Sequence, residues 1–221
     1  MSSIAPISLE EGASQIGLNL ESRQLELLRA YLAMLQKWNK VYNLTAVRDP
    51  ADMVTHHLLD SLAVIPALLR QRSHGSEQPF SLLDVGSGGG LPGAVIAICC
   101  PQAMVSCVDT VAKKAAFQQQ IALELRLKNL RGIHARVENL TDPQDVVCSR
   151  AFASLADFTS WTRNSLATEG VWMAMKGRNP VDEIRDLPQN VDVFHVEQVA
   201  VPALDAERCI VWMKPSASQH A

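Results

Sequence analysis

Apolar residues recur at helical spacing in the first third of the chain. One set consists of Leu25, Leu28, Leu32, Leu35 and Tyr42, and the charged residues of this segment fall on other faces of the expected helix. This spacing predicts an amphipathic helix that packs its apolar face on a larger body.

A second helix is expected to begin at Asp49 and Pro50, a good cap and first-turn pair. Pro66 is expected to kink it or end it early, because proline lacks the backbone donor that a helix interior needs. Its apolar face is formed by Val54, Leu58, Leu62, Ile65 and Leu69.

The pattern changes after residues 71–79 (QRSHGSEQP), a polar stretch typical of a linker. Beyond it, short apolar runs alternate with helical spans, as in a parallel sheet with helices on both faces. The expected strands are residues 80–85, 104–109, 132–137, 145–149, 171–176, 191–199 and 208–214. The expected helices are residues 91–100, 112–127 and 155–166.

The last two expected strands are separated only by a loop, so they should form an antiparallel hairpin. The sequence therefore predicts an α/β fold with a mostly parallel seven-stranded sheet in a domain of residues 76–221. Residues 1–75 are expected to form a helical extension packed on that domain.

Composition narrows the class of protein. With 48% hydrophobic residues, 19% charged residues and a net charge of −3, the chain can build a core but has no overall positive charge for nucleic acid. Five cysteines without Cys-x-x-Cys spacing favour reduced thiols, and no metal site is expected. The N-terminus lacks a signal-peptide pattern, and the longest apolar run, residues 91–100, is too short to span a membrane. We expect a soluble, cytoplasmic protein that does not associate with membranes.

The strongest local signal is a glycine-rich loop at residues 84–93 (DVGSGGGLPG). It follows the first expected strand and opens a helix, where glycines let the backbone approach a ligand. The dinucleotide fingerprint G-x-G-x-x-G fails because Leu91 stands where its third glycine is required, and the lysine of a Walker loop is absent. A tight turn that holds no ligand is the alternative to a binding loop.

Two acids accompany this loop at the ends of expected strands. Asp109 closes the second strand, where a carboxylate can accept both ribose hydroxyls of a nucleoside. Asp84 lies near the end of the first strand, where it would repel phosphates but suit a ligand with an ammonium and a sulfonium group. S-adenosylmethionine carries both groups, so these residues favour it as the cofactor.

Several segments, taken in order, resemble a known family. They are residues 38–45 (WNKVYNLT), 57–61 (HLLDS), 84–93, 149–155 (SRAFASL) and 176–177 (KG). They are similar to the bacterial small-subunit ribosomal RNA methyltransferase G family, also called glucose-inhibited division protein B. The resemblance implies a Rossmann-like class I methyltransferase that moves a methyl group from S-adenosylmethionine to N7 of one guanine in 16S ribosomal RNA.

The family's cofactor contacts fall on matching residues of this chain. Together with Asp84 and Gly88 of the loop, the expected cofactor-binding residues are Gly86, Leu91, Asp109, Val137, Glu138 and Arg150. The chain lacks an Asp-Pro-Pro-aromatic element and a suitably placed nucleophilic cysteine. That absence is consistent with methylation at N7, which needs no general base, and equally with no catalysis. Arg150 and Lys176, which end adjacent expected strands, are expected to position the RNA.

A local excess of basic residues predicts an RNA-facing side, although a solvated helix face is the alternative. Between residues 111 and 136, Glu124 is the single acid against Lys113, Lys114, Arg126, Lys128, Arg131 and Arg136. Phe152, beside the cofactor site, is expected either to stack on the target base or to pack in the core.

The expected partner is small-subunit ribosomal RNA or the small subunit itself, bound by a monomer. Two other functions stay open. One is a methyltransferase of the same fold that acts on a small molecule or a protein, and the other is a module that binds S-adenosylmethionine without turnover.

Overall fold

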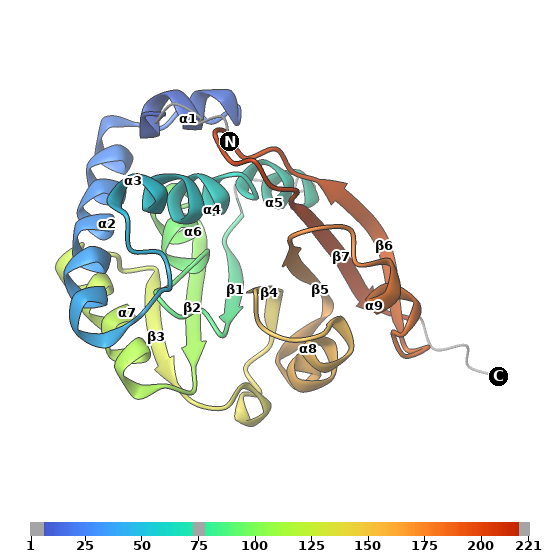
Figure 1. The fold of residues 1–221 in the computed structure, drawn as a ribbon. Helices are drawn as coiled ribbons and strands as arrows, with labels where there is room; N and C mark the ends of the chain where they lie inside the picture. The colour runs from blue at the N-terminus through green and yellow to red at the C-terminus, as the bar shows by residue number, and fades with distance from the viewer. Residues whose placement is uncertain (1–6, 73–77, 217–221) are drawn as a thin grey trace.

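The computed structural model describes residues 7–72 and 78–216 of the 221-residue chain (Figure 1). Its centre is a seven-stranded sheet in the order β3-β2-β1-β4-β5-β7-β6. The strands are β1 (Phe80–Val85), β2 (Ala103–Asp109), β3 (Leu130–His134), β4 (Gln144–Arg150), β5 (Leu166–Lys176), β6 (Val191–Gln198) and β7 (Cys209–Pro215). The first five strands are parallel, and β7 lies antiparallel between β5 and β6. The predicted α/β fold with a terminal antiparallel hairpin is confirmed.

Two strand boundaries differ from the prediction by three residues or more. β3 ends at His134 because the segment Val137–Asn139 forms a short 3-10 turn, η2. β5 begins at Leu166, which pairs with Gln144, so the apolar Leu166 belongs to the strand and not to the preceding helix.

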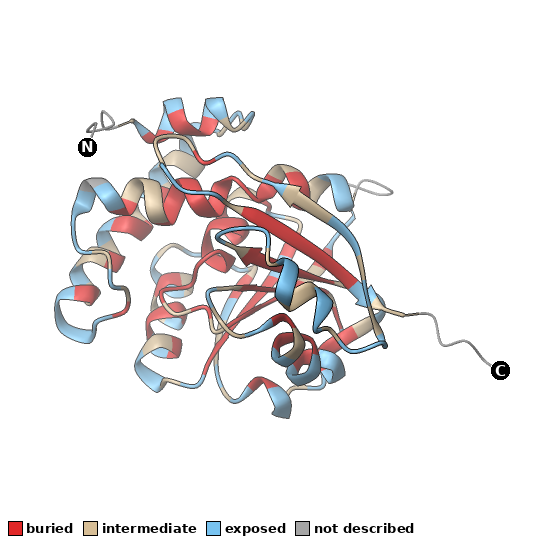
Figure 2. Cartoon of the chain, turned by 45° about the vertical axis from the view of Figure 1, so that its right-hand side comes forward, coloured by how far each residue is buried: buried red, intermediate tan, exposed pale blue. Residues whose placement is uncertain are grey.

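Helices cover both faces of the sheet, as the alternation of strands and helices predicts. In β1, Leu82 faces one core, with α6 (Gly93–Cys99) and α7 (Ala112–Glu124). Leu83 and Val85 face the other core, with α8 (Leu155–Thr162), the 3-10 turn η3 (Arg163–Ser165) and α9 (Val181–Arg185). Figure 2 shows buried residues along the central strands and the inner helix faces, with exposed residues outside.

The N-terminal helices pack on the first of these faces (Figure 1). α1 (Leu9–Gln15), which the sequence pattern did not predict, precedes α2 (Ser22–Tyr42), the predicted amphipathic helix. Leu28 and Leu35 of α2 are fully buried in the core that also contains Trp212 of β7. The extension and the sheet therefore share one hydrophobic core.

The second predicted helix is a run of shorter pieces. They are α3 (Pro50–Met53), a π-helix η1 (Val54–Leu59), α4 (Asp60–Leu62) and α5 (Ile65–Gln71). The predicted interruption near Pro66 is present: the helix breaks at residues 63–64, and Pro66 lies in the first turn of α5, where its missing N–H would have no partner in any case. Of the expected linker at residues 71–79, residues 73–77 lie outside the described residues. No helix within the described ranges has both the length and the apolar content of a membrane span.

Candidate functional site

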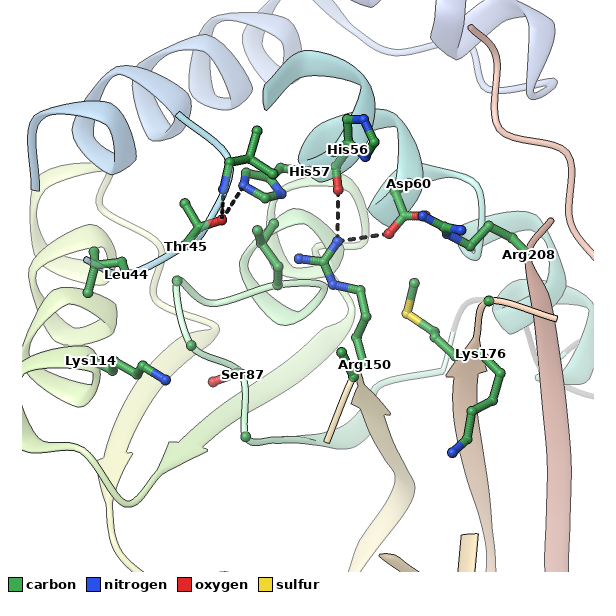
Figure 3. A pocket seen from close by; sticks show the side chains of 18 residues that line it. Leu44, Thr45, His56, His57, Asp60, Ser87, Lys114, Arg150, Lys176 and Arg208 are labelled. Carbon is green, nitrogen blue, oxygen red and sulfur yellow. Dashed lines mark hydrogen bonds and ion pairs between the residues drawn. The ribbon is translucent and has the colours of Figure 1, made fainter. Parts of the chain in front are cut away.

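Two adjoining cavities lie at the carboxyl ends of the parallel strands. The smaller cavity, of about 390 Å³, is bounded by the ends of β1 and β2 and by the segments that follow β3 and β4. The larger cavity, of about 540 Å³, extends from the glycine loop to the end of β5 and to the N-terminal helices (Figure 3). Gly86, Lys114 and Ala151 line both, so one ligand can reach from the smaller cavity into the larger.

The glycine loop that separates β1 from α6 depends on backbone conformations that favour glycine. Gly86 and Gly88 have φ angles of 66° and 57°. A Cβ atom on Gly86 would lie 2.4 Å from Cδ2 of Phe152, so a side chain here would displace that ring. From behind the loop, the buried hydroxyl of Tyr31 in α2 donates to the carbonyl oxygen of Gly89 over 2.8 Å. The N-terminal extension thus supports the loop.

Asp109 is held in place at the edge of the smaller cavity. The backbone N–H groups of Gly88 and Val111 donate to its Oδ2 and Oδ1 over 3.1 Å and 2.9 Å, and Nζ of Lys114 is 3.7 Å from Oδ2. Each carboxylate oxygen keeps acceptor capacity for a ligand hydroxyl.

Val137 and Glu138, in the η2 turn, line the smaller cavity together with Asp109. A fixed carboxylate suits a ribose, and the apolar Val137 suits an adenine ring. The residues present therefore fit S-adenosylmethionine, the cofactor that the sequence predicts.

Asp84 lines neither of these two cavities, although the sequence predicts a cofactor contact there. Because side chains alternate along β1 and Val85 faces the α8 side, Asp84 faces α6 and is fully buried. Its Oδ2 accepts a hydrogen bond from the backbone N–H of Gly93 over 2.8 Å. Burial raises the pKa of Asp84 to about 7, although the Gly93 N–H and Arg150 act in the opposite direction. Asp84 fixes the start of α6 beneath the loop.

The structure brings Arg150 and Lys176 together at the larger cavity, as their positions at adjacent strand ends predict. Nη1 of Arg150 donates to the carbonyl oxygen of His56 over 3.0 Å and to Oδ2 of Asp60 over 2.8 Å (Figure 3). Nζ of Lys176 donates to Oε2 of Glu183 over 2.7 Å. The predicted cofactor residues Gly88 and Leu91 line the same cavity.

Sequence reasoning did not assign the contribution of the N-terminal extension to this cavity. Leu44, Thr45, His57 and Asp60 line it, and they lie in the segments 38–45 and 57–61 that carry the family resemblance. That resemblance was the signal that could have identified them.

His57 is neutral and helps to fix the loop after α2. Its Nε2 lies 2.9 Å from Oγ1 of Thr45, which also accepts from the backbone N–H of Val47. Burial, together with the positive charge of Arg150, lowers the pKa of His57 to about 4. At neutral pH the Thr45–His57 pair therefore adds no charge to the cavity.

The six basic residues predicted to bind RNA do not form one surface. Lys114 and Arg136 line the cavities, and Lys113 lies beside Lys114 in the first turn of α7. Because α7 runs back along the sheet, Arg126 and Lys128 follow it at the opposite edge, where the parallel strands begin. Arg131, the second residue of β3, lines a separate groove there with Lys128. The expectation of one continuous basic side is not met.

Phe152 lies in the wall of the smaller cavity. Its ring packs edge-on against Phe158 and Trp161, with centroids 6.5 Å and 5.8 Å away. The aromatic ring is therefore on the Asp109 side of the site.

Known proteins with similar sequences match nearly the whole chain. The family model for rRNA small subunit methyltransferase G matches residues 24–211. Ribosomal RNA small subunit methyltransferase G of Polaromonas naphthalenivorans (strain CJ2) is 63% identical over 209 residues, which cover 94% of this chain and 95% of the relative. The protein of the same name from Acidovorax sp. (strain JS42) is 64% identical over 215 residues, covering 95% of each.

Solved structures of methyltransferases share the fold at low sequence identity. Magnesium protoporphyrin IX methyltransferase from Synechocystis PCC 6803, with bound SAM, gives a TM-score of 0.55 at 14% identity, covering 90% of this chain and 99% of the other. TrmN from Thermus thermophilus gives a TM-score of 0.53 at 18% identity, covering 73% of this chain and 53% of the other. With the family model covering residues 24–211 and relatives aligned over 94% and 95% of its length, this chain belongs to the rRNA small subunit methyltransferase G family.

Proposed function

We propose that this protein transfers the methyl group of S-adenosylmethionine to N7 of one guanine in 16S ribosomal RNA of the small subunit. The observation that carries the proposal is the pair of adjoining cavities in a chain of this family, one fitted for a nucleoside and one rich in positive charge. Among the residues that the structure describes, Asp60 is the single carboxylate that lines the larger cavity, against the cations Lys114, Arg150, Lys176 and Arg208. Such a cavity attracts an anionic substrate such as RNA.

Methylation at N7 needs little general acid or general base catalysis from the protein. S-adenosylmethionine would supply the methyl group on a positively charged sulfur. The lone pair of guanine N7 would form the new bond to the methyl carbon as the sulfur–carbon bond breaks, S-adenosylhomocysteine would leave, and the guanine would lose no proton. Holding the two reactants in line can contribute about 7 to 11 kcal/mol. The residues proposed to hold the cofactor are Gly86, Gly88, Leu91, Asp109, Val137, Glu138 and Arg150.

The larger cavity is the proposed place of the target nucleotide. Guanine N7 faces the deep, narrow groove of an RNA helix, so the base must be presented from a loop or turned out of its stack. Arg150 and Lys176 would then hold a phosphate or the guanine O6. We also propose that the protein acts as a monomer, and a ribosomal substrate supports action in the cytoplasm.

The test is methylation of small-subunit RNA and of assembled small subunits with labelled S-adenosylmethionine, followed by mapping of N7-methylguanine. One modified guanine is expected. Label in a protein or a small molecule alone would favour the methyltransferase of another substrate class. Cofactor binding without any labelled product would favour a binding module.

Substitution of Asp109 tests the cofactor part of the proposal. Asp109→Asn removes the charge that holds the ribose, so the affinity for S-adenosylhomocysteine is expected to fall tenfold or more, by about 1.4 kcal/mol at least. Calorimetry measures this loss. Asp142→Asn, at a carboxylate whose side chain is 80% exposed, is the matched control and is expected to bind like the wild type. Wild-type affinity in Asp109→Asn would contradict the assignment of the smaller cavity.

A further inference from the structure

A cluster of charged side chains in the larger cavity connects helix α4 of the N-terminal extension to the segment that precedes β7. Asp60, in α4, is 3% exposed and accepts from Nη1 of Arg150 over 2.8 Å and from Nε of Arg208 over 2.7 Å. Arg208 is 148 residues away in sequence and directly precedes β7. Figure 3 shows both guanidinium groups directed at this carboxylate from different walls of the cavity.

The cluster has more positive charge than its carboxylate can neutralise. One carboxylate faces two guanidinium groups, which leaves a net charge of one. The other two cations of the cavity each have an acid nearby: Lys176 pairs with Glu183, and Lys114 is 3.7 Å from Asp109. The unbalanced charge of the larger cavity is therefore concentrated at Arg150 and Arg208.

The two arginines also keep hydrogen-bond donors for a ligand. Their side chains are 21% and 25% exposed, whereas the side chain of Asp60 is 4% exposed. Besides its bond to Asp60, Arg208 donates from Nη1 to the carbonyl oxygen of Glu207 over 2.8 Å. Within the described residues, Nη2 of Arg208 and Nε and Nη2 of Arg150 have no protein acceptor. Two forked groups held side by side suit the oxygens of a phosphate.

We propose that Arg208 binds a phosphate of the RNA beside the target guanine, and that Asp60 is the positioning residue that holds Arg208 and Arg150 for this contact. This inference rests on the proposed function. Arg208 lines the larger cavity on the side of β5 and α4, whereas Lys114, Gly86 and Ala151 lie at the junction with the smaller cavity. The anion at Arg208 is therefore assigned to the RNA and not to the carboxylate of the cofactor.

The decisive measurement is the salt dependence of RNA binding, because each phosphate contact releases counterions. Arg208→Gln is expected to weaken binding to a transcript of small-subunit RNA by about tenfold, and to lower the slope of log Kd against log salt concentration by about 1. Its affinity for S-adenosylhomocysteine should stay within about twofold of the wild type. Arg185→Gln makes the same charge change at an arginine that is 69% exposed on α9, and is expected to keep the wild-type slope.

Asp60→Asn separates positioning from charge. It keeps both arginines, so the salt slope is expected to stay as in the wild type, while kcat falls about tenfold because the guanidinium groups are no longer held. Arg208→Lys, which keeps the charge but not the fork, should retain the slope. If Arg208→Gln alone does not fold, the double variant Asp60→Asn with Arg208→Gln removes both members of one ion pair and should show the same loss of slope.

Two outcomes would overturn the inference. One is a wild-type salt slope in a folded variant that lacks Arg208. The other is a tenfold loss of affinity for S-adenosylhomocysteine in that variant, which would place the cofactor's carboxylate at Arg208. Failure of the proposed function can be distinguished from failure of this inference, because the wild-type protein itself would then not methylate the RNA.

Discussion

At the scale of single residues, strand alternation decides which acids can meet a ligand. Asp84 and Asp109 both end or nearly end parallel strands, yet Asp109 lines the smaller cavity and Asp84 is fully buried beneath the loop. Asp109 is the last residue of β2, where the side chain reaches the edge of the sheet. Asp84 precedes the last residue of β1, so its side chain faces α6. The sequence contains this alternation in Leu83 and Val85, which indicates that Asp84 faces the opposite side of the strand. The charge of Asp84 nevertheless favoured a ligand contact in the prediction.

Asp84 should make the free energy of unfolding depend on pH. Its pKa rises from an ordinary 3.8 to about 7 on folding, so the folded state binds this proton more tightly than the unfolded state. The group therefore stabilises the fold below its unfolded pKa, and that contribution is lost as the pH rises through the folded pKa. Relative to Asp84→Asn, the wild type is expected to lose up to roughly 4 kcal/mol of unfolding free energy between about pH 4 and pH 7.

Urea unfolding of both proteins across this pH range measures that difference. His57, whose pKa is lowered to about 4 by burial, has the opposite sign but is common to both proteins, so the comparison removes it. Parallel stability curves for the wild type and Asp84→Asn would show that Asp84 does not titrate in this window.

At the scale of elements, the spacing of apolar residues predicts burial better than it predicts hydrogen bonding. Leu58, Leu62 and Ile65 are buried as their spacing predicts, although the helix contains the π-turns of η1 and a break before α5. A π-helix changes which carbonyl each N–H reaches while leaving the apolar face almost unchanged, so periodicity does not reveal it. The α2 helix, which is regular, is predicted nearly to its ends.

The α2 helix supports the glycine loop through one hydrogen bond, and this contact can be tested. Tyr31→Phe leaves the carbonyl oxygen of Gly89 without its buried donor, so the free energy of unfolding is expected to fall by about 1 to 3 kcal/mol. Because the loop also lines the larger cavity, affinity for S-adenosylhomocysteine should fall with it. Tyr42→Phe, at a residue 39% exposed at the end of the same helix, is the control. Equal thermal stability and equal cofactor affinity in the two variants would contradict the proposal that α2 supports the glycine loop through Tyr31.

At the scale of the whole molecule, a charge excess along the sequence is a poor guide to a surface. The basic residues between 111 and 136 span a helix that crosses the sheet from one edge to the other, so they separate into two groups. The parallel strands and the antiparallel hairpin, though not the order of the strands in the sheet, could be predicted because each follows from short apolar runs and the lengths between them. The grouping of distant side chains could not, because it depends on how the N-terminal helices dock on the sheet.

The separation into two groups predicts unequal effects on RNA binding. Lys113→Gln with Arg136→Gln, at the edge that holds the cavities, is expected to lower the salt slope by about 1 to 2. Arg126→Gln with Lys128→Gln makes the same charge change at the far edge and is expected to leave the slope unchanged. Filter binding to small-subunit RNA at several salt concentrations compares them. A larger effect at the far edge would mean that the RNA approaches the sheet from that side.

The pairing of Asp60 with Arg208 also bears on synthesis of the protein. Asp60 emerges from the translating ribosome early, and its second partner emerges only when nearly all of the strands have been made. The larger cavity stays incomplete until Arg208 has been made, directly ahead of β7, which lies between β5 and β6. Full activity therefore belongs to the finished polypeptide, and premature termination ahead of residue 208 yields a product that lacks one of the two arginines.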